Sequence, residues 1–96
     1  MSTHQRHFSV SFVLPISGVS IVNRTGPLVE AWNKKHDRNA AVQVRSMRCD
    51  GVTLDRDNAF MHGIQWEIQL CMTGPLANPS NENDITSHLL NAIHAP

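Results

Sequence analysis

Three segments of the chain alternate between apolar and polar residues, which is the pattern of a strand with one buried face. The longest alternates over residues 62–74, where the apolar members of one parity are Ile64, Trp66, Ile68, Leu70 and Met72. Residues 7–14 alternate in the same way and end at Pro15, and residues 40–49 form the third segment. The pattern therefore predicts three long strands, each with one side for a core and one for solvent.

Apolar residues at helical spacing predict two helices. The first is expected to start after Thr25, a residue type that caps helix N-termini, with Pro27 in its first turn and a stop near Asn39. The second is expected over about 82–94, with acidic residues in its first turn. Residues 16–25 fit either a short helix or an extended connection. The apolar stripes of the two helices are Leu28, Val29 and Trp32, and Ile85, Leu89, Ala92 and Ile93.

Turn residues separate these elements. Asp50-Gly51 is a hairpin signal, and residues 52–54 fit a short returning strand or the start of a wide loop. Residues 76–81, with Pro79 among several breakers, are expected to form a loop. The resulting order is strand, helix, strand, strand, helix, with a further short strand if residues 52–54 pair.

This order predicts an α+β fold, in which an antiparallel-rich sheet of three to four strands carries two helices on one face as a two-layer sandwich. A ferredoxin-like topology fits the order, but its final strand is lacking unless residues 52–54 supply it. The single domain is expected to span residues 7–96, after a flexible N-terminus over residues 1–6. The expected core comprises Phe8, Val10, Phe12, Val42, Val44, Ile64, Trp66, Ile68 and Leu70 from the sheet, and Leu28, Trp32, Ile85, Leu89 and Ile93 from the helices.

The other side of the sheet, here called the open face, carries mostly small or neutral polar side chains, and we expect it to bind a partner. Its expected members are Ser9, Ser11, Gln43, Gln65, Glu67, Gln69 and Cys71, together with Arg45. Because the charge is low, little solvation free energy is lost when another protein covers this surface. Exposed free thiols are usually avoided, so Cys71 on this parity suggests that a partner or a second copy covers part of the face.

Length and composition fit one globular domain. The 96 residues include 41% hydrophobic and 17% charged residues, which suits a single core. No apolar run approaches the roughly 20 residues of a membrane span, and the polar N-terminus lacks a signal-peptide segment. We therefore expect a cytoplasmic protein without membrane contact, in which Cys49 and Cys71 are reduced thiols.

Charge is distributed unevenly, although the formal net charge is zero. Residues 1–56 hold all eight basic residues and four of the eight acids, and residues 57–96 hold the other four acids. Cations outnumber acids within residues 24–48, which is typical of a contact with a nucleic-acid backbone. Against this, the aromatic residues of the strands have core parity, whereas single-strand binders stack bases on aromatics of the open face. The basic patch comprises Arg24, Lys34, Lys35, Arg38, Arg45 and Arg48.

No motif carries a recognisable catalytic or metal-binding chemistry, so we expect no cofactor and no metal. Six histidines are scattered through different elements, and no His or Cys pair has zinc-ligand spacing. Residues 55–58 resemble the start of a calcium loop but lack its Gly at the sixth position and its distal Glu. Asp55, Asp57 and His62 form the best cluster for acid–base catalysis, which leaves a small ferredoxin-like enzyme with a dispersed site as an alternative.

These observations favour a small non-enzymatic protein that acts by binding another protein. We expect the open face or an edge strand to form a homodimer, with charged patches left for a target. Small cytoplasmic chains without a catalytic motif are common among inhibitors and adaptors encoded by phages and other mobile elements, and we expect a role of that kind. A nucleic-acid-binding protein that uses residues 24–48 is the first alternative, ahead of the enzyme.

Overall fold

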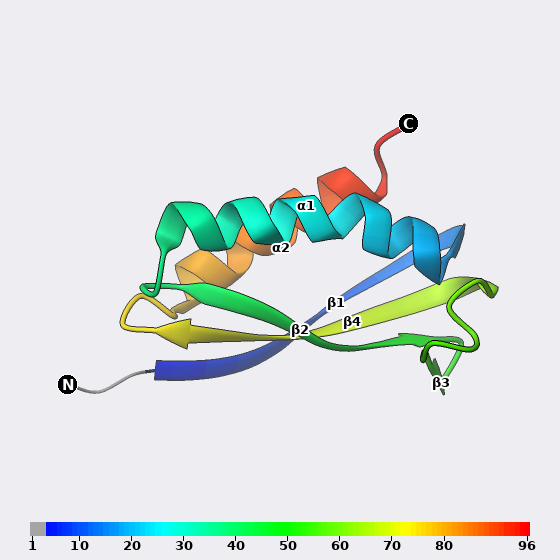
Figure 1. Ribbon diagram of the computed structural model, residues 1–96, viewed down its shortest axis with the longest axis horizontal. Coiled ribbons are helices and arrows are strands. Elements are labelled where there is room, and N and C mark those ends of the chain that lie inside the picture. The colour runs from blue at the N-terminus through cyan, green and yellow to red at the C-terminus, as the bar shows by residue number, and fades with distance from the viewer. Residues whose placement is uncertain (1–3) are drawn as a thin grey trace.

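The computed structural model describes residues 4–96 and contains one sheet and two helices (Figure 1). All strand pairs are antiparallel, the strand order is β1-β4-β2-β3, and both helices lie on the same side of the sheet. The predicted α+β two-layer sandwich is therefore confirmed. The elements are β1 (His4–Ser17), α1 (Gly18–His36), β2 (Ala41–Cys49), β3 (Val52–Thr53), β4 (His62–Gly74) and α2 (Pro79–Ile93).

The order of the three long strands, β1-β4-β2, matches the first three strands of a ferredoxin-like sheet. In that topology the final strand pairs with β1. The short β3 does not supply it, because β3 pairs with β2 on the opposite edge. Within residues 4–96, β1 is consequently left as an edge strand.

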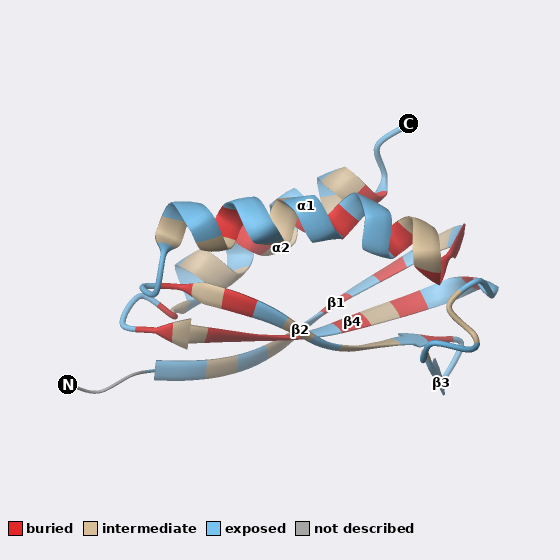
Figure 2. Ribbon diagram, in the orientation of Figure 1, coloured by how far each residue is buried: buried red, intermediate tan, exposed pale blue. Residues whose placement is uncertain are grey.

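The core lies between the sheet and the helices, where the buried residues of both layers meet (Figure 2). Phe12 and Trp66 both point inward and stack with their ring centroids 6.5 Å apart. Trp32 is also buried, and its indole N–H donates to the backbone oxygen of Ala40 at 2.7 Å. The buried members of the expected core are Val10, Phe12, Trp32, Val42, Trp66, Ile68, Leu70, Ile85, Leu89 and Ile93.

The prediction is wrong for one residue expected in the core, because the Ile64 side chain is 54% exposed. It lies opposite a β-bulge in β1, where the register shifts between Val13 and Ile16. At this end of β4, Gly63 takes the inward position instead, directly against the buried Cys49.

A second bulge changes the facing of β2. The register with β4 shifts between Val44 and Ser46, so that one extra residue, Arg45, is inserted. Beyond this point Met47 packs against the core, whereas Arg48 pairs opposite Glu67 and is exposed. The bulge therefore moves Arg48 to the open face, where strict alternation from Val44 would have placed it inside.

Helix α1 begins eight residues earlier than expected. Ser17, not Thr25, is its N-cap, and the Ser17 hydroxyl accepts from the backbone N–H of Ser20 at 3.2 Å. The Thr25 hydroxyl instead donates to the carbonyl of Ile21 inside the helix, and Pro27 lies in the helix interior. Residues 16–25, which fitted either a short helix or an extended connection, are therefore mostly helical.

Helix α2 also begins earlier than expected. Asn78 caps it by accepting from the backbone N–H of Asn81 at 2.9 Å, and Pro79 occupies the first turn, where its missing N–H costs nothing. These residues were expected to form a loop. At the other terminus, β1 already begins at His4, so residues 4–6 belong to the strand rather than to a flexible segment, and residues 1–3 lie outside the described range.

Candidate functional site

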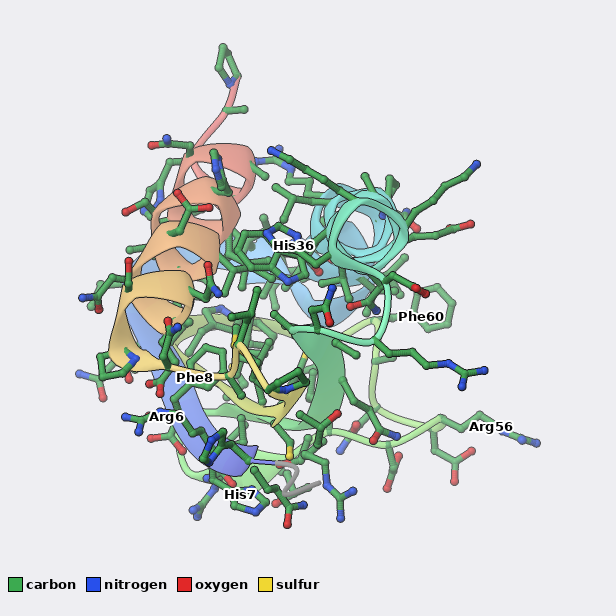
Figure 3. The ribbon with its side chains drawn as sticks, turned by 90° about the vertical axis from the view of Figure 1, so that its left-hand side faces the viewer. Arg6, His7, Phe8, His36, Arg56 and Phe60 are labelled. Atoms are coloured by element: carbon green, nitrogen blue, oxygen red, sulfur yellow. The ribbon has the colours of Figure 1, made fainter. Side chains whose placement is uncertain are left out.

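The open face is formed by β1, β4 and β2 on the side of the sheet away from the helices. In Figure 3 His7 lies on this side, whereas its neighbour Phe8 points between the sheet and α2. Because successive residues of a strand alternate in facing, the polar residues of all three strands gather here. The exposed members are Ser9, Ser11, Gln43, Gln65 and Gln69, and Glu67 is half-buried.

Two shallow hollows lie on this face, and each has a volume of about 420 Å³. The first lies at the end of the sheet near the β2–β3 turn, and the second lies across the middle of the three strands. The first is lined by Ser11, Val13, Arg48, Gly51, Gln65 and Glu67, with Phe12 and Trp66 beneath, and the second by His7, Phe8, Ser9, Arg45, Gln69 and Leu70. The open face is therefore uncovered and also contains hollows into which side chains of a partner can fit.

Hydrogen bonds within the open face join two of its charged side chains to neutral neighbours. The Gln69 amide donates to a Glu67 carboxylate oxygen at 2.8 Å, and Arg48 Nη2 donates to the Gly51 carbonyl at 3.3 Å. The side chain of Arg45 is exposed beside the second hollow. Such a surface can donate and accept hydrogen bonds, which suits the backbone and side-chain amides of another protein.

Cys71 lies on the open face by register but is buried. The Gln5 amide nitrogen is 3.5 Å from the Cys71 Sγ, and only 4% of the residue is exposed. The chain thus covers this thiol itself. The inference that Cys71 requires a covering partner loses its basis, and this residue does not offer a contact surface.

Cys49 is the other free thiol, and it is fully buried in the core. Burial raises the pKa of the Cys49 thiol, and the neighbouring Asp50 carboxylate, whose Oδ2 lies 3.7 Å from the Cys49 Sγ, raises it further. A thiol held in its protonated form is a poor nucleophile. Cys49 is therefore placed for packing and not for covalent chemistry.

The six residues of the basic patch lie in three separate places. Arg24 is bound within the chain, because its Nη1 donates to the carbonyls of Ile93 at 2.6 Å and Ala95 at 3.0 Å, after the last turn of α2. Lys34 and Lys35 are exposed in the last turn of α1, and Arg38 is exposed just after that helix. Arg45 and Arg48 are on β2 on the opposite side of the sheet.

Replacing Arg24 with alanine is expected to lower the free energy of unfolding by about 1 kcal/mol, because two carbonyls at the end of α2 lose a charged donor. Urea denaturation would measure the change. The exposed Lys34 on the same helix is the matched control, and Lys34→Ala should change stability by less than about 0.5 kcal/mol. Equal effects of the two substitutions would contradict the capping role of Arg24.

The residues of the alternative catalytic cluster do not converge. The Asp55 carboxylate accepts from the backbone N–H groups of Asp57 at 2.8 Å and Asn58 at 3.1 Å, which is the role of Asp in a turn. His62 is exposed at the start of β4, paired opposite Ser17. Within residues 4–96, no three His, Cys, Asp or Glu side chains are grouped closely enough to hold a metal ion.

Three exposed residues on or beside the open face were not assigned to it from the sequence, although Arg48 was named in the basic patch. Val13 is 67% exposed on the rim of the first hollow, and Arg48 also lines it. The signal for Arg48 was the pair Arg45-Ser46, two consecutive polar residues that interrupt the alternation of β2. Phe60, in the β3–β4 connection, is 75% exposed and projects away from both layers (Figure 3), and no periodicity marks it.

No helix within residues 4–96 is both long enough and apolar enough to cross a membrane. Comparisons of the chain with protein-family models, with curated proteins and with solved structures found no match.

Proposed function

We propose that this chain is a non-enzymatic protein-binding module of the cytoplasm, which acts as an inhibitor or adaptor by docking its open face on another protein. It works as a homodimer, and its source is a phage or another mobile element. The observation that carries the binding role is the open face itself, three strands wide and free of any covering element within residues 4–96, with two hollows lined by serine and glutamine side chains together with apolar and charged neighbours.

The chemistry of this face favours a protein over a nucleic acid. Covering serine and glutamine side chains costs little when a partner supplies new hydrogen bonds. A single-stranded nucleic acid would need aromatic rings to stack its bases, but Phe12 and Trp66 are buried on the other side of the sheet. The separation of Lys34 and Lys35 from Arg45 also leaves no continuous basic track for a phosphate backbone.

The test is affinity capture from a host lysate, followed by direct binding measurements with the purified captured protein. Gln65→Arg, which places a bulky charge in the first hollow, is expected to weaken binding at least about tenfold, or about 1.4 kcal/mol. Ser87→Arg is the matched control, because Ser87 is exposed on α2 in the opposite layer, and it should bind as the wild type does.

Two outcomes would contradict the proposal. One is equal weakening by Gln65→Arg and Ser87→Arg, which would place the contact elsewhere. The other is binding of RNA or duplex DNA at about 50 mM salt that weakens steeply as salt is raised, which would favour the nucleic-acid alternative.

A further inference from the structure

The two edges of the sheet differ in how the chain protects them. Along the β2 edge, the Asn33 side chain of α1 accepts from the backbone N–H of Val42 at 2.7 Å and donates to its carbonyl at 2.9 Å. Farther along this edge, the Leu54 N–H donates to the Met47 carbonyl at 2.9 Å, and β3 pairs with the end of β2. The bulge at Arg45 adds a further irregularity. Such devices prevent a strand edge from pairing with another chain.

The β1 edge has no comparable protection. Within residues 4–96, no strand, loop or side chain forms a hydrogen bond with the backbone of residues 5–13 from the side away from β4. Nine regular residues are long for an exposed edge, because strands average only about five or six. The edge ends at the bulge before Ile16, next to Pro15, which has no N–H to offer.

The backbone groups that β1 presents outward can be identified from β4. The Gln65 N–H donates to Asp50 Oδ1 at 2.9 Å, and the Gln65 carbonyl accepts from the Asp50 N–H at 2.8 Å, so the backbone of Gln65 is directed to the β2 side. Antiparallel strands alternate this direction residue by residue, so Trp66 turns its groups to Phe12 of β1. By the same alternation, the residues of β1 whose N–H and C=O groups point to the free edge are Gln5, His7, Ser9, Ser11 and Val13.

We propose that the β1 edges of two copies of this chain pair antiparallel about a two-fold axis at Ser9, joining the two sheets into one. This inference rests on the homodimer named in the proposed function and specifies its interface. In this register Ser9 forms a hydrogen-bonded pair with the partner's Ser9, and His7 pairs with the partner's Ser11. Each such pair exchanges two backbone hydrogen bonds.

The composition of β1 makes it complementary to itself in this orientation. The residues whose backbone groups point to the free edge are placed symmetrically about Ser9. A two-fold axis at Ser9 therefore gives each of them a hydrogen-bonding partner in the other copy. The basic residues His4, Arg6 and His7 all lie in the first half of the strand, and antiparallel pairing places them against the neutral second half. The small serines at the centre also allow close approach on the open-face side.

The difference between the two edges limits the assembly to a dimer. Each copy has one unprotected edge, and the pairing consumes it in both copies. The outer edges of the joined sheet are then the two β2 edges, which Asn33, Leu54 and β3 protect. An isologous contact of this kind closes on itself and does not propagate into fibres.

Pairing also completes the open face. The second hollow reaches the β1 edge at His7 and Ser9. In the joined sheet its boundary on that side becomes the partner's β1, with the partner's Ser11 beside His7. Two open faces thereby form one continuous surface with two-fold symmetry.

The experiment compares Ser9→Pro with Ser9→Ala. Proline at this position removes an outward N–H and leaves the ladder to β4 intact, so the variant should be a folded monomer of 10.7 kDa. The wild type and Ser9→Ala, which keeps the N–H, should have about twice that mass by light scattering at micromolar concentration. A wild type that stays monomeric, or a folded Ser9→Pro variant that stays dimeric, would overturn the inference.

Amide hydrogen exchange of the wild type tests the same interface if Ser9→Pro does not fold. The amides of Ser9 and Ser11 should exchange at least about tenfold more slowly as concentration rises through dimerisation, whereas Val10 and Phe12, bonded to β4, should be protected throughout. If the Ser9 and Ser11 amides exchange fast at every concentration, the β1 edge is not the dimer interface.

The outcomes separate this inference from the proposed function. Loss of target binding in Gln65→Arg with an unchanged dimer supports the open face on its own. A monomeric wild type whose target binding still falls in Gln65→Arg overturns the edge pairing and leaves the open face in place. A dimer broken by Ser9→Pro, with target binding indifferent to Gln65→Arg, supports the edge and contradicts the open face.

Discussion

Replacing Gly63 with alanine is expected to lower the free energy of unfolding by about 3 kcal/mol, at the upper end of the range for overpacked cores. A β-carbon at this position would overlap the Cys49 Sγ and would come within 3.3 Å of both the Cys49 Cβ and the Asp50 Oδ2. Neither group can easily move away, because Cys49 is fully buried in the core and Asp50 is bonded to the backbone of Gln65. Urea denaturation followed by tryptophan fluorescence would measure the loss.

A second substitution tests whether the sulfur is the cause. Cys49→Ala removes the Sγ and leaves the Cβ, so in this background Gly63→Ala should cost no more than about 1 kcal/mol. The two substitutions would then be strongly coupled. An equal cost of Gly63→Ala in both backgrounds would show that the backbone, and not the contact with Cys49, requires glycine here.

The sequence predicted the fold where the alternation of side chains was regular. The parity of β4 correctly placed Trp66, Ile68 and Leu70 inside, because a one-residue error would have exposed the whole apolar set. The same reasoning failed at Ile64, and strict alternation from Val44 would also have turned Arg48 inward; both residues lie near bulges. A bulge adds one residue to one strand only, so its position depends on the partner strand and is not contained in local periodicity.

The helix boundaries failed for a different reason. Thr25-Gly-Pro is a good local signal for a helix start, but Ser17 lies closer to the end of β1 and also has a side chain that can cap. The helix interior tolerates Pro27 and Gly26 because Ile21 and Trp32 on either side of them pack into the core. Tertiary contacts thus outweighed the local preference of two residues.

The candidate site was only partly predictable from sequence. Side-chain parity identified Ser9, Ser11 and the glutamines of the open face, because all of them lie on regular stretches of strand. The burial of Cys71 could not be foreseen, since it depends on the Gln5 amide of the neighbouring strand. The contrast between the two edges was equally hidden, because the side chain that protects β2 comes from Asn33 in a helix.

The second large effect that we expect comes from removing the protection of β2 by Asn33. Asn33→Ala should both destabilise the chain and allow it to associate beyond the dimer. Val42 is buried, and the substitution leaves its N–H and C=O without the Asn33 amide, at a cost of about 1–3 kcal/mol. The part of the β2 edge around Val42 also becomes available for pairing, whereas β3 and Leu54 still cover its far part. With β1 edges already paired, dimers could then join through β2, and light scattering should detect species larger than the dimer.

Two controls distinguish edge pairing from general aggregation of a weakened protein. Asn33→Asp keeps an oxygen that accepts from the Val42 N–H but turns a carboxylate oxygen towards the Val42 carbonyl, so it should also destabilise the chain, whereas its charge at the edge should still prevent pairing. Adding Ser9→Pro to Asn33→Ala closes the β1 edge and leaves one open edge per chain, so growth should stop at dimers. Large species that persist in this double variant would mean that exposed core, and not the strand edges, drives the association.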